Sequence, residues 1–297
     1  MSLAEPINPP TVVRERPALT SGELANFELV MNWWRELAGQ GTPPADRYLA
    51  EQYLEHSPNF PTGREAFTAH VAAIGGARTL RELKPYIDTP VVIGSAKGDF
   101  VFLVFELEAP DPRNPQNSFF YNTFELFRIE NGLIAEHWDS TKRSARPEIT
   151  ADLSAAQPSQ QVARGSLGSL SAAEADTLRI ATIEMKDVMQ YGDREAALAL
   201  IADDYIQHNP AVSQGRDGLL TYLDRSASAR PVQEAWLEQP LLLLVSGPYA
   251  LELRERMAAD PNDPASNYVW SHFDMLRIEN GLVVEHWDDA VIAPRAQ

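Results

Sequence analysis

The chain contains no cysteine. Disulfide bonds, thiolate nucleophiles and zinc sites with cysteine ligands are therefore excluded. It also lacks an apolar run of about 18 residues, the length that a membrane-spanning helix needs. The N-terminal sequence MSLAEPINPPTVVRERP has no apolar core followed by small residues, so we expect no signal peptide. These absences predict a cytoplasmic protein without a membrane partner.

Basic residues are scarce as well. Lys and Arg number 25 against 42 Asp and Glu, which gives a formal net charge of −17. Nucleic acids and anionic membranes are bound mainly through basic patches, so neither is expected as a partner. The 297 residues are 44% hydrophobic, which is globular composition and enough for two domains of ordinary size.

The most informative feature of the sequence is a motif that occurs twice. Residues 128–139 read RIENGLIAEHWD, and residues 277–288 read RIENGLVVEHWD. Further upstream, Tyr53 and His56 are matched by Tyr205 and His208 at a slightly larger offset. A repeat of this length has the period of a whole domain and exceeds the 20–50 residues of a solenoid repeat. The chain is therefore a duplicated domain.

Each half begins with helical patterns and continues with strand patterns. Capping boxes open the first helix of each half, at Thr20–Glu23 and Ser171–Glu174. The other helices are expected from Pro43 towards Leu54, from 63 to 75, from 194 to 205 and from near 215. Strands are expected at 91–93, 100–108, 119–129, 133–139, 241–245, 249–257, 268–278 and 282–288.

This order predicts an α+β fold: two tandem cone-shaped domains, each with three N-terminal helices packed on a curved antiparallel sheet. The domains are expected at 20–140 and 171–297. An irregular arm, 1–19, precedes them. Residues 141–170, rich in Ser, Ala, Gln and Gly, are expected to form a flexible linker.

Three motifs of the second half resemble the SnoaL-like polyketide cyclase family of the nuclear transport factor 2-like superfamily. They are Tyr205-Ile-Gln-His208-Asn-Pro210 with Gly215, Phe273-Asp274-Met-Leu-Arg277-Ile-Glu-Asn-Gly281, and Glu285-His286-Trp287-Asp288. The resemblance implies a cone with a deep, cofactor-free site in which an acidic residue does acid/base work on a polyketide-like carbonyl compound. Relatives use the same cone for isomerisation, epoxide hydrolysis, dehydration or ligand binding. The first half matches more loosely.

Strand periodicity places Tyr268, Trp270, His272, Asp274 and Leu276 on one face. If this face points into the cone, burial would raise the pKa of Asp274 and a neighbouring imidazolium would oppose that shift. A three-residue turn at 279–281 would place His286 opposite Asp274 on the same face. A two-residue Asn-Gly turn would shift the register by one and bring Trp287 there instead. We favour the three-residue turn.

The candidate site residues follow from these patterns and the resemblance. Catalytic candidates are Asp274, His272, His286 and His208; substrate-binding candidates are Tyr268, Trp270, Asp288 and Tyr205. The first half offers a second site at Glu125, His137, His56, Tyr121 and Asp139. Two alternatives stay open: the aspartates after the tryptophans can serve as structural hydrogen-bonding groups, and His56 and His208 can simply close turns.

Other chemistries fit less well. His208, His272, His286, Asp274 and Asp288 are plausible metal ligands, but no His-x-x-x-His spacing occurs, so no metal or other cofactor is expected. A Gly-x-Ser-x-Gly elbow is also missing. A ketosteroid isomerase would need a second carboxylic acid and a tyrosine as donors, and an epoxide hydrolase of the limonene type would need an Asp–Arg–Asp set; neither pattern is favoured.

The sequence therefore predicts a cofactor-independent acid/base enzyme that acts on a small hydrophobic carbonyl compound, by aldol cyclisation, isomerisation or dehydration. The alternative is a non-catalytic protein that binds a small apolar ligand. In either case the two halves are expected to form an internal pseudo-dimer, with further homo-oligomerisation left open.

Overall fold

The computed structural model describes residues 6–40, 45–75, 91–143, 145, 165–226 and 229–294. Its elements follow the same order twice. The first half contains α1 (Ser21–Gln40), α2 (Ala45–Tyr48), β1 (Leu49–Glu55), α3 (Arg64–Gly75), β2 (Val91–Lys97), β3 (Phe100–Asp111), β4 (Asn114–Glu130) and β5 (Leu133–Asp139). The second half contains α4 (Ala172–Thr182), η2 (Ile183–Val188), α5 (Arg194–Leu200), β6 (Ile201–Gln207), α6 (Gly215–Ser226), β7 (Leu242–Ser246), β8 (Tyr249–Asp260), β9 (Asp263–Glu279) and β10 (Leu282–Asp288).

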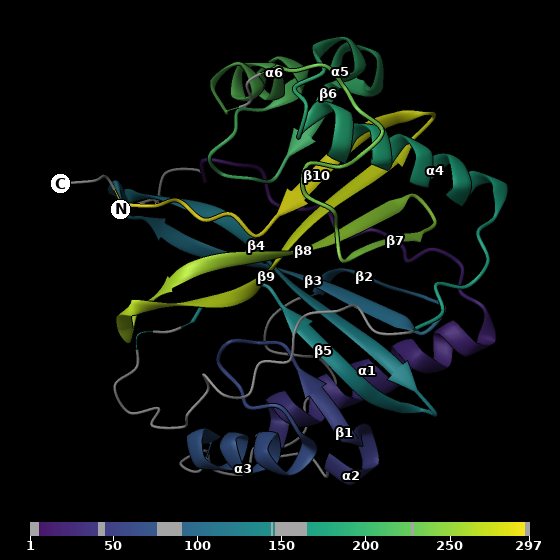
Figure 1. Ribbon diagram of the computed structural model, residues 1–297, viewed down its shortest axis with the longest axis vertical. Helices are drawn as coiled ribbons and strands as arrows, with labels where there is room; N and C mark the ends of the chain where they lie inside the picture. Colours follow the sequence, from purple (N-terminus) through teal and green to yellow (C-terminus); the bar gives the residue numbers. More distant parts are fainter. Residues whose placement is uncertain are drawn as a thin grey trace.

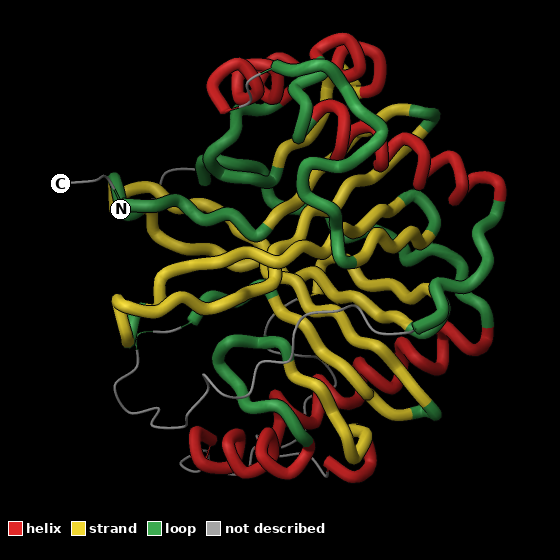
Figure 2. Tube along the Cα trace, in the orientation of Figure 1, coloured by secondary structure: helices red, strands yellow, loops and turns green. Residues whose placement is uncertain are grey.

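Each half forms one five-stranded sheet. The strand orders are β1-β5-β4-β3-β2 and β6-β10-β9-β8-β7. The helices lie on the outer side of each sheet, and the two sheets face each other in the middle of the molecule (Figure 1, Figure 2). The expected α+β architecture of two tandem cone domains is confirmed. Among the described residues, no helix has the length and apolar character needed to cross a membrane.

Both capping boxes are present. The Thr20 backbone N–H donates to Glu23 Oε2 at 2.8 Å, and the Ser171 backbone N–H donates to Glu174 Oε2 at 2.8 Å. In return, each glutamate backbone N–H donates to the hydroxyl group of its partner. These reciprocal bonds satisfy amide groups that the first helical turn leaves unpaired, and they fix where the first helix of each half begins.

The prediction for the second helix of each half was wrong in its extent. The helices end at Tyr48 and Leu200, and strands β1 and β6 follow where a longer helix was expected. These strands pair in parallel with β5 and β10, so the sheets are mixed rather than wholly antiparallel. The stretch alternates only loosely in polarity, and pairing with a buried neighbouring strand decided its conformation.

The two sheets share a hydrophobic core. Phe124 and Phe273, at equivalent positions of β4 and β9, stack in parallel with centroids 5.4 Å apart. The hydroxyl groups of Ser95 and Ser246 are 2.8 Å apart across the same interface. Separate apolar clusters lie between each sheet and its own helices. The outer face of each sheet, on which the candidate site lies, is therefore covered by helices of the same half.

The N-terminal arm is irregular, as expected, but its described part makes specific contacts with both halves. The Asn8 side-chain amide donates to the carbonyl oxygen atoms of Phe120, at 2.9 Å, and His208, at 3.0 Å. Arg14 forms an ion pair with the buried Glu285 at 2.9 Å. The arm of the first half is thus bound to the second. Most of the expected linker lies outside the described residues.

Candidate active site

A cavity of about 630 Å³ lies inside the second half, between its sheet and its helices. The sheet side is lined by charged and polar groups from three neighbouring strands: Glu252, Arg254, Arg256, His272, Asp274, His286 and Asp288. The helical side and the loop before β7 contribute mostly apolar groups: Met185, Met189, Val212, Leu219, Tyr222 and Leu237. The volume suits a small organic ligand, and the two walls suit a molecule with one polar and one apolar face.

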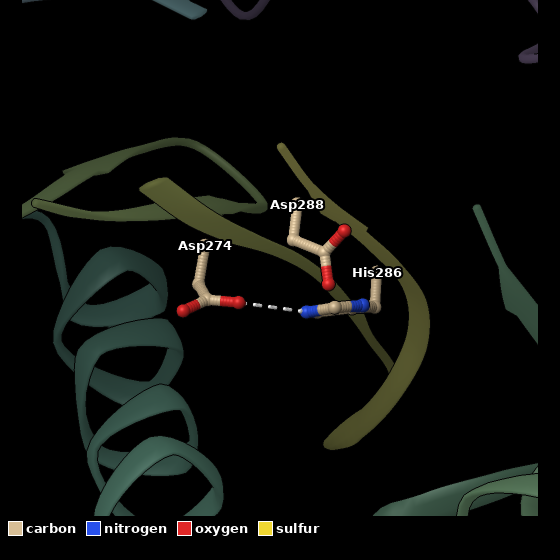
Figure 3. A group of neighbouring side chains, drawn as sticks. All are labelled: Asp274, His286 and Asp288. Carbon is tan, nitrogen blue, oxygen red and sulfur yellow. Dashed lines mark hydrogen bonds and ion pairs between the residues drawn. The ribbon is translucent and has the colours of Figure 1, made fainter. Parts of the chain in front are cut away.

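Asp274 lies at the centre of the polar wall, between two imidazole groups. Its Oδ1 is 3.2 Å from His286 Nε2, and its Oδ2 is 3.1 Å from His272 Nε2. Asp288, on the neighbouring strand, lies beside Asp274 and His286 (Figure 3). The structure therefore brings together three of the predicted catalytic residues and one predicted substrate-binding residue.

The hydrogen-bond partners of His286 favour a ring that is protonated on both nitrogen atoms. Gln207 Oε1 accepts from the Asn209 backbone N–H at 2.9 Å, which fixes the orientation of the amide. His286 Nδ1, 2.8 Å from the same oxygen, must then be a donor, while Nε2 faces the Asp274 carboxylate. Burial alone would lower the pKa of His286, but the Asp274 hydrogen bond and nearby negative charges raise it to about 9.

Two opposing effects act on the pKa of Asp274, and that of the imidazolium groups is the larger. Burial tends to raise the pKa of this carboxyl group, but the charge and hydrogen bond of His272, together with His286, hold it well below its ordinary value. His272 is itself positioned by Asp289, whose Oδ1 lies 2.8 Å from Nδ1. Asp289 was missed in the sequence; its counterpart in the first half is Ser140, and this difference was the available signal.

Two buried glutamates in the cavity were also missed. Burial raises the pKa of Glu184 to about 7, against the charge of His286, and raises that of Glu252 to about 7, against the charge of Arg254. On β8, Glu252 and Arg254 alternate with leucines, a pattern typical of a strand with one face exposed to solvent. A clue was available, because Leu103 and Phe105 occupy the equivalent positions of the first half.

The remaining second-half candidates divide into two groups. Tyr205 and Asp288 line the cavity. His208 does not: its ring stacks on Trp287 at 4.9 Å, and Nε2 is 2.9 Å from Glu285, on the other side of β10. Its burial and these partners indicate that His208 packs between the two halves.

Tyr268 and Trp270 lie away from the described lining of the cavity, although they share a strand face with Asp274. The Tyr268 hydroxyl accepts from the Arg143 backbone N–H at 3.0 Å, and the Lys142 ammonium group lies 4.5 Å from the Trp270 ring. Both aromatic side chains therefore contact the segment that follows β5, because β9 extends beyond the cavity at this end.

The predicted three-residue turn is wrong, yet His286 still reaches Asp274. The hairpin has a two-residue turn, Asn280-Gly281, with φ angles of 51° and 80°, and Glu279 pairs with Leu282. A bulge between Val283 and Glu285 then inserts one residue. The inserted residue returns His286 and Asp288 to the face that carries Asp274, because side chains alternate with a period of two. Asp274 is paired with Asp288, and His286 reaches it diagonally.

The first half contains a different cluster at the equivalent positions. His137 lies between two glutamates, with Nε2 2.5 Å from Glu125 Oε2 and Nδ1 3.0 Å from Glu55 Oε1. The Tyr53 hydroxyl donates to Glu55 Oε2 at 2.5 Å. Burial tends to lower the pKa of His137, but the two carboxylates raise it well above its ordinary value.

The other second-site candidates lie around this cluster. Asp139 Oδ1 accepts hydrogen bonds from the backbone and hydroxyl groups of Thr141, and burial raises its pKa. His56 stacks on Trp138 at 4.6 Å, the same arrangement as His208 in the second half. The Tyr121 ring packs against Phe119, with centroids 6.0 Å apart.

One group in the cavity has ligand atoms close enough for a metal ion. Atoms of Asp274, His286 and Asp288 lie within 4.8 Å of one another. However, both nitrogen atoms of His286 face hydrogen-bond acceptors, and Asp288 already accepts from Asn209 Nδ2 at 2.6 Å. A metal ion there would have to displace the proton on His286 Nε2, so its binding would weaken as pH falls.

Comparison with known proteins supports the resemblance seen in the motifs. Residues 183–286 match the family model of the SnoaL-like domain. This range is therefore similar to SnoaL-like domains. The first half has the same strand order and shares the repeated motifs. A search of curated proteins found no match.

Several solved structures are similar to one half of the chain. TsrD from Streptomyces laurentii is 24% identical, with 40% of this chain and 90% of that chain covered and a TM-score of 0.27. An epoxide hydrolase of M. tuberculosis is 14% identical (39% and 82% covered, TM-score 0.29). A protein assigned as a polyketide cyclase from Acidithiobacillus ferrooxidans is 17% identical (42% and 92% covered, TM-score 0.30). Likeness at this level does not indicate which reaction the chain performs.

Proposed function

We propose that the second half is a cofactor-independent acid/base enzyme that acts on a small carbonyl compound with a hydrophobic face. The reaction class is proton transfer next to the carbonyl group, as in an aldol cyclisation, an isomerisation or a dehydration. Asp274, His272 and His286 form the polar centre of the site. Tyr205 and Asp288 contact the substrate from the same wall of the cavity.

The observation that carries this proposal is the cavity with its Asp274-centred network. An anionic carboxylate between two imidazolium groups provides fixed charges at a partly buried site, where they act more strongly than in solution. The same cavity contains carboxyl groups whose pKa is about 7, so they can both accept and release protons near neutral pH. The apolar helical wall suits the hydrocarbon part of a substrate.

A binding protein without catalytic activity is the second candidate, and one observation favours it. Both oxygen atoms of Asp274 are already engaged by imidazole groups, at 3.1 and 3.2 Å. A carboxylate in this state is a weak base, so a cavity with no other proton acceptor would only hold a ligand. The two candidates differ in whether a bound carbonyl compound exchanges protons with solvent.

Deuterium exchange tests the proposal. The protein is incubated in D₂O with 2-tetralone or with a bicyclic 1,3-diketone, and NMR follows the loss of C–H signals next to the carbonyl. We expect exchange above the buffer rate, reduced at least 100-fold in Asp274→Asn while binding, measured by calorimetry, is retained. Binding by the wild type without faster exchange would support the binding protein and contradict the enzyme.

We also propose that the duplication forms an internal pseudo-dimer of domains 20–140 and 171–297. The shared core between the sheets, with Phe124 against Phe273, supports it. Light scattering should give the mass of one chain, 33.0 kDa. A stable species of twice that mass would show that two chains associate. A cross-link between positions 124 and 273 that joined two chains would then indicate that the sheets pair between chains instead.

A further inference from the structure

Glu184 lies on the helical wall of the cavity, opposite the sheet. It belongs to η2 (Ile183–Val188), a π-helical turn that continues α4. The residue is only 2% exposed, it lines the cavity, and only desolvation and the charges of its neighbours, with no hydrogen bond, act on its carboxyl group. Buried carboxyl groups normally have hydrogen-bond partners, so an unpartnered one in a cavity suggests a ligand. Single π-turns within α-helices are frequently found at functional sites.

The other carboxyl groups of the cavity are already engaged. Asp274 contacts His272 and His286, Asp288 accepts from Asn209 and Ala290, Glu252 pairs with Arg254, and Glu238 pairs with Arg256. A proton acceptor must be able to reach the substrate without first losing a bound partner. Glu252 Oε2 accepts no hydrogen bond either, but it lies 2.6 Å from Arg254 Nη2. Among the described lining residues, Glu184 is the carboxyl group that has neither a hydrogen bond nor an ion pair to break.

The first half supports this reading by contrast. The two capping boxes align at an offset of 151 residues, which places Trp33 at the position of Glu184. Trp33 is 3% exposed and packs against Tyr48 and Phe67 in the apolar core of that half. A helix position that can be filled by a large apolar side chain instead carries an unpaired acid where the cavity is open. Packing does not explain that choice.

We infer that Glu184 is the catalytic residue that exchanges a proton with the substrate, an inference that rests on the function proposed above. The Glu184 carboxylate removes a proton from the carbon next to the carbonyl. The C–H bond breaks, and its electron pair forms the enolate. The neutral carboxyl group then returns a proton to carbon, or to a departing hydroxyl group in a dehydration. The cations Arg254, His272 and His286 of the opposite wall favour the enolate charge.

Basicity supports the same assignment. Burial raises the pKa of Glu184 to about 7, whereas the pKa of Asp274 is held well below its ordinary value. A base with a pKa near the working pH combines a large ionised fraction with a strong driving force for proton removal. Asp274 is then the fixed anion that keeps the neighbouring imidazole groups charged, and Glu184 is the group that changes its protonation state.

Glu184→Gln tests the inference with 2-tetralone in the deuterium-exchange assay. We expect the exchange rate to fall at least tenfold while the dissociation constant of the ketone changes by less than threefold. Glu195→Gln, which changes an exposed glutamate of α5, is the matched control and should behave as wild type. An exchange rate that fell less than tenfold in Glu184→Gln would overturn the inference. If Asp274→Asn nevertheless lost its exchange activity, the proposed function would still stand. No exchange by the wild type would contradict the proposed function itself.

The pH profile provides a readout that a structural role would not change. The wild-type rate should rise with pH through an inflection near 7, as Glu184 ionises, and Glu184→Asp should retain an inflection at a lower rate. Should Glu184→Gln not fold, as judged by its thermal transition, a Glu184→Asp variant with wild-type rate and profile would overturn the inference, because one methylene displaces the acceptor.

Discussion

The two halves of the chain share a topology but have opposite interiors. In the first half one imidazole, His137, lies between the carboxylates of Glu55 and Glu125. In the second half one carboxylate, Asp274, lies between the imidazoles of His272 and His286. Replacements at a few equivalent positions therefore invert the charge at the centre of the cone. The fold allows either arrangement, and the chemistry is determined by the side chains that the fold positions.

The same contrast extends to the third strand of the cone. In β3, Leu103 and Phe105 face the interior, and Phe105 packs against Trp34 with ring centroids 5.2 Å apart. In β8 the residues with the same register are Glu252 and Arg254, which line the cavity. Large apolar side chains thus occupy the interior of the first half where the second half has an ion pair. This difference shows how a duplicated domain can differ in function between its copies without changing its strands.

Converting the central site of the second half into that of the first should have the largest effect. Asp274→Glu with His272→Thr introduces the residues found at Glu125 and Thr123. We expect the exchange rate to fall about 100-fold or more, because the carboxylate is displaced by a methylene and loses one imidazolium partner. The assay with 2-tetralone measures it. A variant that kept more than a tenth of the wild-type rate would show that these differences do not decide activity.

Filling the cavity should remove binding while sparing stability. Glu252→Leu with Arg254→Phe copies the interior of the first half, and we expect calorimetry to detect no binding of 2-tetralone. Replacing a buried ion pair by apolar groups is often neutral or stabilising, by up to about 4 kcal/mol. The urea midpoint should therefore stay the same or rise. A lower midpoint would mean that the ion pair stabilises the second half.

The converse exchange is the control. Leu103→Glu with Phe105→Arg removes two buried apolar side chains from the first half and introduces charges into a packed core. We expect a loss of about 3–5 kcal/mol in the free energy of unfolding, measured with urea. Equal changes in the free energy of unfolding for the two double variants would refute the idea that the interiors differ.

The sequence predicted the fold well because local signals agreed. The duplicated motif, the capping boxes and the run of strands all specify the same architecture. The turn was misjudged because the bulge after Val283 is a tertiary feature without a residue signature of its own. Likewise, β1 and β6 form because β5 and β10 offer parallel partners, and no local pattern reveals such a partner.

The candidate site was predicted only in part. Strand alternation correctly grouped His272 and Asp274, since a period of two is a property of the strand itself. Glu184, Glu252 and Arg254 were missed because charged residues on helices and strands normally face water. Their burial depends on the cavity, which is a property of the assembled cone. A position-by-position comparison with the apolar first half would have indicated them.

A stability measurement at two pH values sharpens the contrast at Glu184. Its pKa is about 7 in the folded protein, above the ordinary value of 4.5. The folded state therefore binds this proton more tightly, and the carboxyl group becomes destabilising as pH rises from 4.5 to 7. Glu184→Gln should raise the free energy of unfolding at pH 8 by roughly 3 kcal/mol at most, at about 1.4 kcal/mol per pKa unit, and change it little at pH 4. A gain that is equal at both values would rule out titration as the cause.

The smallest effect that we expect concerns the arm. The Thr11 hydroxyl accepts from Trp287 Nε1 at 3.1 Å and lies 3.3 Å from His208 Nδ1, whereas Trp138 Nε1 and His56 Nδ1 of the first half have no partner among the described residues. Thr11→Val keeps the shape but leaves two buried polar groups unpaired, so the free energy of unfolding should fall by about 1–2 kcal/mol.

Thr11→Ser, which retains the hydroxyl group, is the matched control and should lose less stability than Thr11→Val. The urea midpoints of both variants and the wild type decide the question. If the valine variant were as stable as the wild type, the second half would tolerate the same unpaired groups as the first. The arm contact would then be a consequence of packing between the halves and not a reason for it.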